Sequence, residues 1–339
     1  MKHLSTLLIC LLIVACQSDT TPTSPLPTTI PTAQLPVTTI STSPPNLALD
    51  INTTTPPPSP PTTIPPTNTP VPLPTLGPTN TPLPSPTPPL IRQQLVGFTS
   101  SGNAINAWHI GTGPHNLLFI GGHHGGYEWN TIILAYEIID YFTADPSRVP
   151  AHITLTIIPS ANPDGQKHIT GTAGRFTPAD IKTNDTFAGR FNADGVDLNR
   201  NWDCNWQTDT RWRDQTITGG GGPFPFSAVE NQHLRHFIDT TTNPELVVWW
   251  HSAADAIFLG QCNGQQAPQT LPLAQTYSQA SNYPIATGGF TAYPITGDAS
   301  DYLNAQGIPS FAIELRDHTN TDFDDNLAGI LALFDYYQP

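Results

Sequence analysis

A long stretch rich in proline, threonine and serine divides the chain into two parts with different physical behaviour. Residues 17–91 hold 23 of the 38 prolines and carry only two charged side chains, Asp19 and Asp50. Such a stretch cannot bury enough apolar surface to offset the conformational entropy that it would lose on ordering. We therefore expect a disordered tether over residues 16–91 and one folded domain over residues 92–339.

The first residues of the chain predict export. Lys2 precedes an apolar run over residues 7–15, which is too short for an ordinary membrane-spanning helix and typical of a secretory signal. Cys16 directly follows a small residue, as at the cleavage site of bacterial lipoproteins. We expect residues 1–15 to be a lipoprotein signal peptide and Cys16 to be lipidated, which would anchor the protein at the outer surface of a bacterial membrane. The alternative is a plain signal peptide with an incidental cysteine.

Composition limits the partners of residues 92–339. The chain carries a formal net charge of -14, nearly all of it in this part, and has no basic run, so we expect no nucleic-acid partner. We also expect a monomer. Cys204 and Cys262 lie outside any Cys-x-x-Cys pair, so a disulfide between them is the default pairing in an exported protein.

Apolar runs of strand length alternate with segments of helical periodicity. Strands are expected at 107–110, 116–122, 153–158, 246–250 and 310–315, and helices at 128–144, 227–238, 272–281 and 326–337. Ser227 and Glu230 have the spacing of a capping box at the start of one helix. The alternation predicts an α/β fold with a mixed, mainly parallel twisted sheet and helices on both faces.

Two histidines and a glutamate fall where a strand passes into a helix. Residues 121–130 read GGHHGGYEWN, which contains His123, His124 and Glu128. The carboxyl ends of strands in open α/β sheets are common ligand sites, and neutral histidine and ionised glutamate are zinc ligands. Histidines at such a place can equally be ordinary hydrogen-bonded residues, so this segment alone leaves both interpretations open.

Two later strands carry further candidates. His251 comes just after the strand at 246–250, as a third metal ligand or as a capped core histidine. Two histidines, one glutamate and a water make the ligand set of catalytic zinc. Glu314 lies inside an apolar strand, where a carboxylate is costly to bury. It is either paired with Arg316 or Arg200, or the general base of a hydrolase.

Residues 195–202, GVDLNRNW, form the most specific segment. Adjacent Asn199 and Arg200 can hold a carboxylate with fork geometry, and Asp197 can accept a hydrogen bond from a ligating imidazole. The alternative is a polar turn.

The segment GVDLNRNW resembles the motif of the zinc metallocarboxypeptidases, the carboxypeptidase A/B-like family, here in a bacterial lipoprotein form. Residues 162–165, NPDG, and 311–317, FAIELRD, also resemble family motifs and follow in the family order. The similarity covers essentially residues 92–339, and it implies the zinc carboxypeptidase fold.

The resemblance implies hydrolysis of the C-terminal peptide bond of peptides with a free C-terminus. One Zn²⁺ would be bound by His124, Glu128 and His251, and Glu314 would activate the zinc-bound water. The resemblance further implies that Asn199 and Arg200 bind the terminal carboxylate of the substrate and that Arg190 polarises the scissile carbonyl. Tyr293 would be the mobile tyrosine that closes over the substrate, and Ser300 would lie near the position that contacts the substrate side chain. Asp197 would orient His124 through a hydrogen bond.

Three features of the sequence allow more than one interpretation. The step from His124 to Glu128 is one residue longer than the family pattern, which we interpret as a longer loop with Glu128 in the first helical turn. His123 is the alternative ligand. Asp298 and Asp301 near Ser300 either favour basic C-terminal residues or serve the structure. Two further functions are a cell-wall peptide amidase or endopeptidase on the same zinc site, and a catalytically inactive surface binding module.

Overall fold

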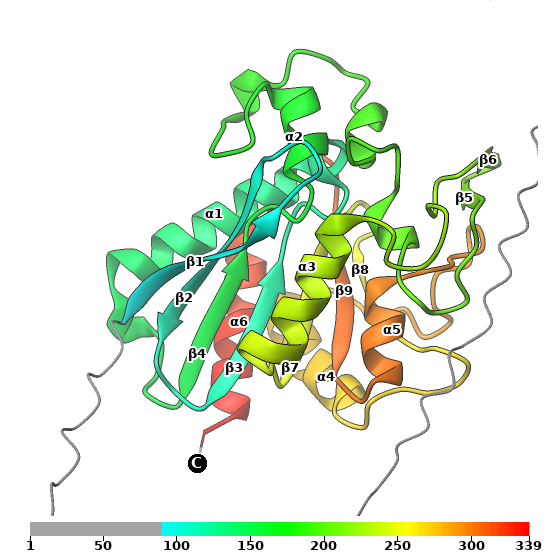
Figure 1. Ribbon diagram of the computed structural model, residues 1–339. Helices are drawn as coiled ribbons and strands as arrows, with labels where there is room; N and C mark the ends of the chain where they lie inside the picture. The colour runs from blue at the N-terminus through cyan, green and yellow to red at the C-terminus, as the bar shows by residue number, and fades with distance from the viewer. Residues whose placement is uncertain (1–89, 339) are drawn as a thin grey trace, which may run out of the picture. The chain divides into compact units, whose positions relative to one another are not determined.

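The computed structural model describes residues 90–338. The predicted signal peptide, the lipidation site at Cys16 and the tether up to residue 89 lie outside the described residues. The described part of the chain is built on a seven-stranded sheet with the strand order β1-β2-β4-β3-β7-β9-β8 (Figure 1). Its strands are β1 Ile91–Phe98, β2 Ala104–Gly111, β3 His115–Ile120, β4 Ile153–Ile158, β7 Leu246–Ser252, β8 Ala256–Leu259 and β9 Ser310–Leu315. A separate small hairpin consists of β5 Thr210–Trp212 and β6 Gln215–Ile217.

The sheet is mixed, as predicted, with its parallel strands in the centre. β4, β3, β7 and β9 run parallel to one another, whereas β1, β2 and β8 pair antiparallel at the two edges. The central strands are apolar on both sides because both faces of the sheet are covered. All seven residues of β7 are buried.

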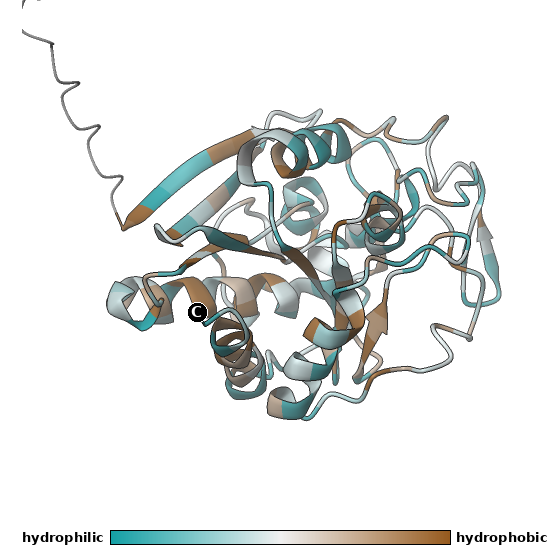
Figure 2. Cartoon of the chain, turned by 90° about the horizontal axis from the view of Figure 1, so that it is seen from below, coloured by the Kyte–Doolittle hydropathy of each residue, from teal (hydrophilic) through white to brown (hydrophobic). Residues whose placement is uncertain are grey.

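Helices cover both faces of the sheet (Figure 2). They are α1 Trp129–Ala144, α2 Pro163–Thr170, α3 Val229–Phe237, α4 Thr270–Ser281, α5 Ala299–Ala305 and α6 Phe323–Tyr336. One core cluster joins the sheet to α1, α4 and α6 through residues such as Ile138, Tyr277 and Leu333. A second cluster joins it to α3 and α5 through Leu234 and Leu303.

The predicted capping box at Ser227 is wrong. α3 begins at Val229 after Ala228, and its first turn has no side-chain cap. The Ser227 hydroxyl instead accepts a hydrogen bond from Asn201 Nδ2 at 2.9 Å, and Glu230 Oε2 accepts one from Asn192 Nδ2 at 3.0 Å. Both side chains therefore bond to residues far away in the sequence, although the local pattern predicts that they cap the helix.

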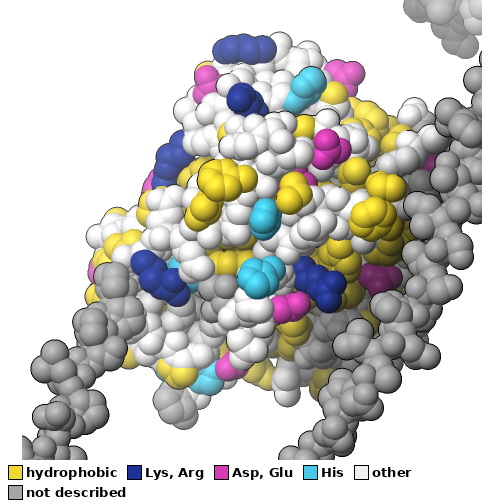
Figure 3. All heavy atoms as spheres, in the orientation of Figure 1, with side chains coloured by type: hydrophobic (Ala, Val, Ile, Leu, Met, Phe, Trp, Pro, Cys, Tyr) yellow, Lys and Arg dark blue, Asp and Glu magenta, His cyan; other side chains and the backbone are white. Residues whose placement is uncertain are grey.

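The predicted disulfide between Cys204 and Cys262 is present and buried. Among the helices of residues 90–338, none is both long enough and apolar enough to cross a membrane. On the face shown in Figure 3, basic, acidic and histidine side chains are scattered among uncharged ones, and in places they lie next to one another.

Candidate metal centre and active site

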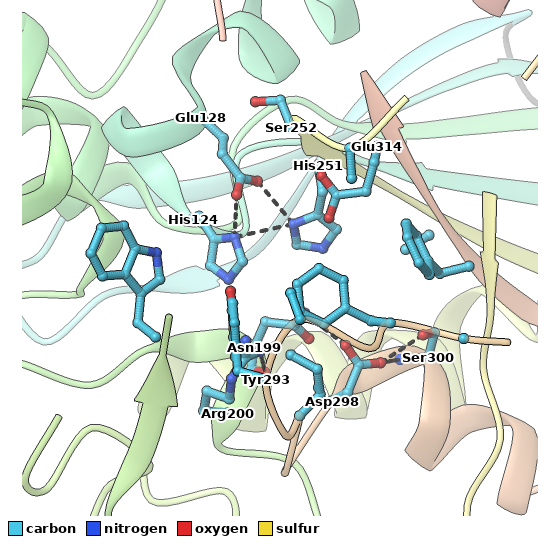
Figure 4. A pocket seen from close by; sticks show the side chains of 18 of the residues that line it. His124, Glu128, Asn199, Arg200, His251, Ser252, Tyr293, Asp298, Ser300 and Glu314 are labelled. Atoms are coloured by element: carbon cyan, nitrogen blue, oxygen red, sulfur yellow. Dashed lines mark hydrogen bonds and ion pairs between the residues drawn. The ribbon is translucent and has the colours of Figure 1, made fainter. Parts of the chain in front are cut away.

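Three buried side chains converge on one point at the carboxyl ends of the central strands (Figure 4). His124 Nδ1 lies 2.7 Å from Glu128 Oε1, and His251 Nδ1 lies 2.9 Å from Glu128 Oε2. The two Nδ1 atoms are 3.1 Å apart. Each of these side chains therefore directs a metal-type donor atom at the same small volume.

The longer spacing from His124 to Glu128 is accommodated by a 3₁₀ turn, Gly125–Glu128. Gly125 has a φ of 47°, and a Cβ on it would lie 2.7 Å from the carbonyl oxygen of Gly189, so only glycine fits. The turn replaces the expected start of the helix, and Glu128 is the N-cap of α1 instead of part of its first turn.

His251 lies inside β7, and the expectation that it follows the strand is wrong. The strand continues through Ser252 because β9 and β8 extend the pairing there; His251 is in register with Glu314, and Glu314 in turn with Ala256. A strand position fixes the His251 backbone more firmly than a loop would.

His123 does not belong to the triad. Its ring is fully buried, stacks on Trp249 at a centroid distance of 4.6 Å, and has no hydrogen-bond partner among the described residues. Burial, reinforced by the nearby His251 and His124, lowers the pKa of His123 well below its ordinary value and keeps it neutral. The geometry thus favours His124, as the sequence predicted.

The donor set fits a zinc ion. Burial opposes ionisation of Glu128, but His124 and His251 outweigh it and hold the pKa of this carboxyl well below its usual range. A buried, ionised carboxylate needs a cation, and two imidazole nitrogens beside it are the partners that Zn²⁺ prefers. With three protein ligands, a bound zinc ion would keep a coordination position for water or substrate.

Asp197 and Arg190 contact the side chains of the triad and hold them in position. Asp197 Oδ1 lies 3.3 Å from His124 Nε2, and Arg190 Nε donates to Asp197 Oδ2 at 2.6 Å. Arg190 Nη1 is also 3.9 Å from Glu128 Oε1. Burial disfavours the charge on Asp197, yet Arg190 and His124 outweigh it, so the pKa of Asp197 is well below its usual range. A ligating imidazole with a carboxylate at its other nitrogen is held in one orientation.

Glu314 lies on β9 at the wall of the same cavity, half-buried. It forms no ion pair with Arg200 or Arg316 within residues 90–338; Arg316 contacts Asp325 at 2.6 Å instead. Burial, followed by the charge of Glu128, raises the pKa of Glu314 to about 8. Its carboxyl group is therefore free to exchange a proton with a substrate or a water molecule.

Asn199 and Arg200 form one end of the cavity. Asn199 Nδ2 donates to Asp298 Oδ2 at 2.8 Å, and Asn199 Oδ1 accepts from the backbone N–H of Ala299 at 2.9 Å. Arg200 Nη1 donates to the Asn199 carbonyl at 2.7 Å, while Arg200 Nε has no partner in the described part of the chain. Arg200 thus keeps donors free, whereas the Asn199 amide is largely used to hold the start of α5.

Asp298 has a structural task at this end. It caps α5, because its Oδ1 accepts from the backbone N–H of Ser300 and Asp301 and from the Ser300 hydroxyl at 2.6 Å. Asp301 Oδ1 accepts from the Gln261 N–H at 2.8 Å, and burial together with Asp298 raises its pKa to about 7. Tyr293 lines the cavity from an irregular segment before α5.

The metal triad, Arg190, Arg200, Tyr293 and Glu314 line one cavity of about 560 Å³, whereas Asp197 lies behind its wall. The lining residues that the sequence did not predict include Tyr127, Trp212, Arg213 and His318. They come from the 3₁₀ turn, the β5–β6 hairpin and the loop after β9, and no local periodicity indicates that such segments meet.

The zinc carboxypeptidase family model matches residues 83–326. The chain is 24% identical over 254 residues to carboxypeptidase B of Astacus astacus, an alignment that covers 70% of this chain and 82% of that protein. It is 27% identical over 196 residues to carboxypeptidase A6 of Homo sapiens, but spans only 44% of that relative. The crystal structure of carboxypeptidase A from Helicoverpa armigera has the same fold, with a TM-score of 0.55 at 21% identity over 74% of this chain and 70% of that one.

Proposed function

The chain belongs to the zinc carboxypeptidase family, and we propose that it removes the C-terminal residue of peptides by hydrolysis with one bound Zn²⁺. One observation carries the proposal. A triad of zinc-type donors, a carboxyl group with a raised pKa at Glu314 and the guanidinium of Arg200 line the same cavity.

His124, Glu128 and His251 would hold the ion, and Asp197 would orient His124. Zn²⁺ in a three-ligand site supplies a Lewis acid for the scissile carbonyl and lowers the pKa of a water molecule. The buried pair of Arg190 and Asp197 would keep the first histidine from turning away.

Glu314 would act as the general base. It takes a proton from the attacking water and then delivers it to the leaving amine, a role that suits a carboxyl group whose pKa lies near neutral pH. Negative charge develops on the carbonyl oxygen during attack, and Arg190 supplies a fixed positive charge beside the triad. Arg190 needs no rearrangement for this role because Asp197 already holds it.

Arg200 would bind the terminal carboxylate of the substrate, which fixes the bond that is cut. Asn199 would contribute mainly by positioning, since its side chain is tied to Asp298 and Ala299. Tyr293 would close over the bound peptide, and Ser300 would face the side chain of the C-terminal residue.

Two rival functions lead to different results. An amidase or endopeptidase on the same metal site would not need a free carboxylate, and an inactive binding module would not turn over. We expect zinc in the purified protein and hydrolysis of N-blocked dipeptides with a free C-terminus. Equal rates on the matching amide-capped dipeptides would favour the amidase or endopeptidase, and bound zinc without turnover of any peptide would favour the binding module.

We also propose that the protein is exported and anchored by a lipid on Cys16 to the outer surface of a bacterial membrane. The apolar run before Cys16 supports this, and so does the Cys204–Cys262 disulfide, because disulfides persist in oxidising compartments. Labelled fatty acid should enter the wild-type protein in a bacterial host and not Cys16→Ala. Equal labelling of both would contradict the anchor.

A further inference from the structure

The β5–β6 hairpin places an arginine at the rim of the cavity. Arg213 follows β5 at the turn of the hairpin, with a φ of 53° in the region that favours glycine. Its guanidinium carbon lies 4.6 Å from the centroid of the Trp212 ring, and both residues line the cavity that holds the metal triad. The stacking holds an exposed charge in one place.

Trp212 is itself held by aromatic neighbours. Its ring lies 4.3 Å from Phe187 and 6.3 Å from Tyr127, and Tyr127 packs 5.1 Å from His318, all as centroid distances. Because Tyr127 directly precedes Glu128, this aromatic cluster connects the hairpin to a metal ligand. The position of Arg213 is therefore fixed relative to the reacting centre.

Part of the aromatic cluster lies on the side of the metal triad away from Arg200. In Figure 4, Glu128 and Ser252 lie on one side of the two imidazoles, and Arg200 and Asp298 on the other. The Ser252 hydroxyl is 3.0 Å from His318 Nδ1, so His318, with Tyr127 packed against it, lies on the side of Ser252. With the terminal carboxylate on Arg200, the residues before the scissile bond run toward the cluster.

The guanidinium of Arg213 stacks on Trp212 and has no acidic partner within the described residues. Arg190 is paired with Asp197, and Arg200 takes the terminal carboxylate, but Arg213 makes no ion pair within residues 90–338. The geometry points to a further subsite, in which Arg213 on Trp212 binds the carboxylate of an aspartate or glutamate one or two residues before the scissile bond. This inference rests on the proposed peptidase function and adds a substrate class to it.

The test compares matched N-acyl tripeptides that end in the residue cleaved fastest by the wild-type enzyme. In one pair of peptides, glutamate or glutamine is the residue directly before the scissile bond. In a second pair, it is the residue two positions before that bond. We expect the zinc-loaded wild type to have a kcat/KM roughly two- to fivefold higher for glutamate at one of these positions at low salt. The preference should shrink at high salt, because the pair is at the rim.

Arg213→Gln should abolish the preference, measured as the ratio of kcat/KM for the glutamate peptide to kcat/KM for the matched glutamine peptide. Arg211→Gln is the matched control, since Arg211 is on the same hairpin but donates to Thr216 Oγ1 and does not line the cavity. No preference in the wild type, or equal losses in the two variants, would overturn the subsite while the peptidase function stands. No turnover of any tripeptide would overturn both.

Discussion

His251 and Glu314 are register partners on the neighbouring parallel strands β7 and β9. In-register residues of adjacent strands point to the same face of a sheet, so a metal-type ligand and a free carboxyl group enter one cavity from two rigid elements. The base is thereby held at a fixed distance from the metal site by backbone hydrogen bonds, which a loop could not achieve.

Glu314→Gln should lower kcat/KM by roughly 100-fold or more and leave bound zinc unchanged. The amide keeps the shape of the side chain but cannot accept the proton. Steady-state kinetics and metal analysis of the same preparation measure both. Glu245→Gln is the control, since Glu245 is exposed, far from the cavity lining, and its side chain pairs with His115 at 2.9 Å. Near wild-type turnover in Glu314→Gln would show that another group is the base.

Arg200→Lys should lower kcat/KM for peptides with a free C-terminus by roughly tenfold or more, because lysine keeps the charge but loses the planar fork. The residual rate on amide-capped peptides should not change. Arg175→Lys serves as the control, because Arg175 pairs with Asp140 at the surface. If Arg200→Lys slows both substrate sets equally, Arg200 does not read the carboxylate.

His124→Ala should lose zinc, whereas His123→Ala should keep it. His124 directs Nδ1 at the triad, but His123 is packed against Trp249. His123→Ala should still lower the melting temperature, because it leaves a cavity in the core. Zinc content measured after dialysis against a weak chelator decides the question, and the reverse pattern would show that His123 is the ligand.

The stability of the metal-free protein should depend on pH through Glu314. Burial raises its folded pKa to about 8, above the ordinary value of 4.5, so the folded state keeps a proton that the unfolded state releases. The free energy of unfolding therefore falls as pH rises from about 4.5 to 8. With chelator present, the melting temperature of Glu314→Gln minus that of the wild type should increase as pH rises from 5 to 9. Parallel curves for the two proteins would contradict the raised pKa.

Loss of the disulfide should weaken both the fold and the carboxylate end of the cavity. Cys204 is joined to the segment before α5, because Gly297 N donates to the Cys204 carbonyl at 2.8 Å. The double substitution of Cys204 and Cys262 by serine should cost roughly 2–5 kcal/mol, a fall in melting temperature of roughly 5–15 °C. KM for free-carboxylate peptides should also rise. An unchanged KM in the folded variant would show that the bridge serves stability alone.

Local patterns predicted most of the central sheet and most of the site. The strands at 153–158 and 310–315 match β4 and β9 in full, since β-branched and apolar runs of this length have few other conformations. The edge strands β1 and β8 were missed. β1 is partly exposed and lacks the continuous apolar run that marks a buried strand, and β8 is an apolar run of only four residues, Ala256–Leu259.

Interactions between distant segments account for the remaining differences. Ser227 and Glu230 have the spacing of a capping box. In the structure, however, the Ser227 side chain accepts a hydrogen bond from Asn201, and the Glu230 side chain accepts one from Asn192. The side-chain amide of Asn199 could bind a substrate carboxylate, yet it is hydrogen-bonded to Asp298 and Ala299 at the start of α5. A short polar side chain can satisfy several partners equally well, and only the folded chain decides which of them lies within reach.

The sequence by itself predicted the disulfide, Glu314 as the general base candidate, and a set of zinc-type ligands in which His123 was still an alternative to His124. These follow from chemistry that each residue carries wherever it lies. Only the tertiary structure decided that His124 and not His123 joins Glu128, that His251 and Glu314 share a register, and that Arg213 reaches the cavity rim. Such choices depend on strand register and on loops that meet in space, which no periodicity along the chain records.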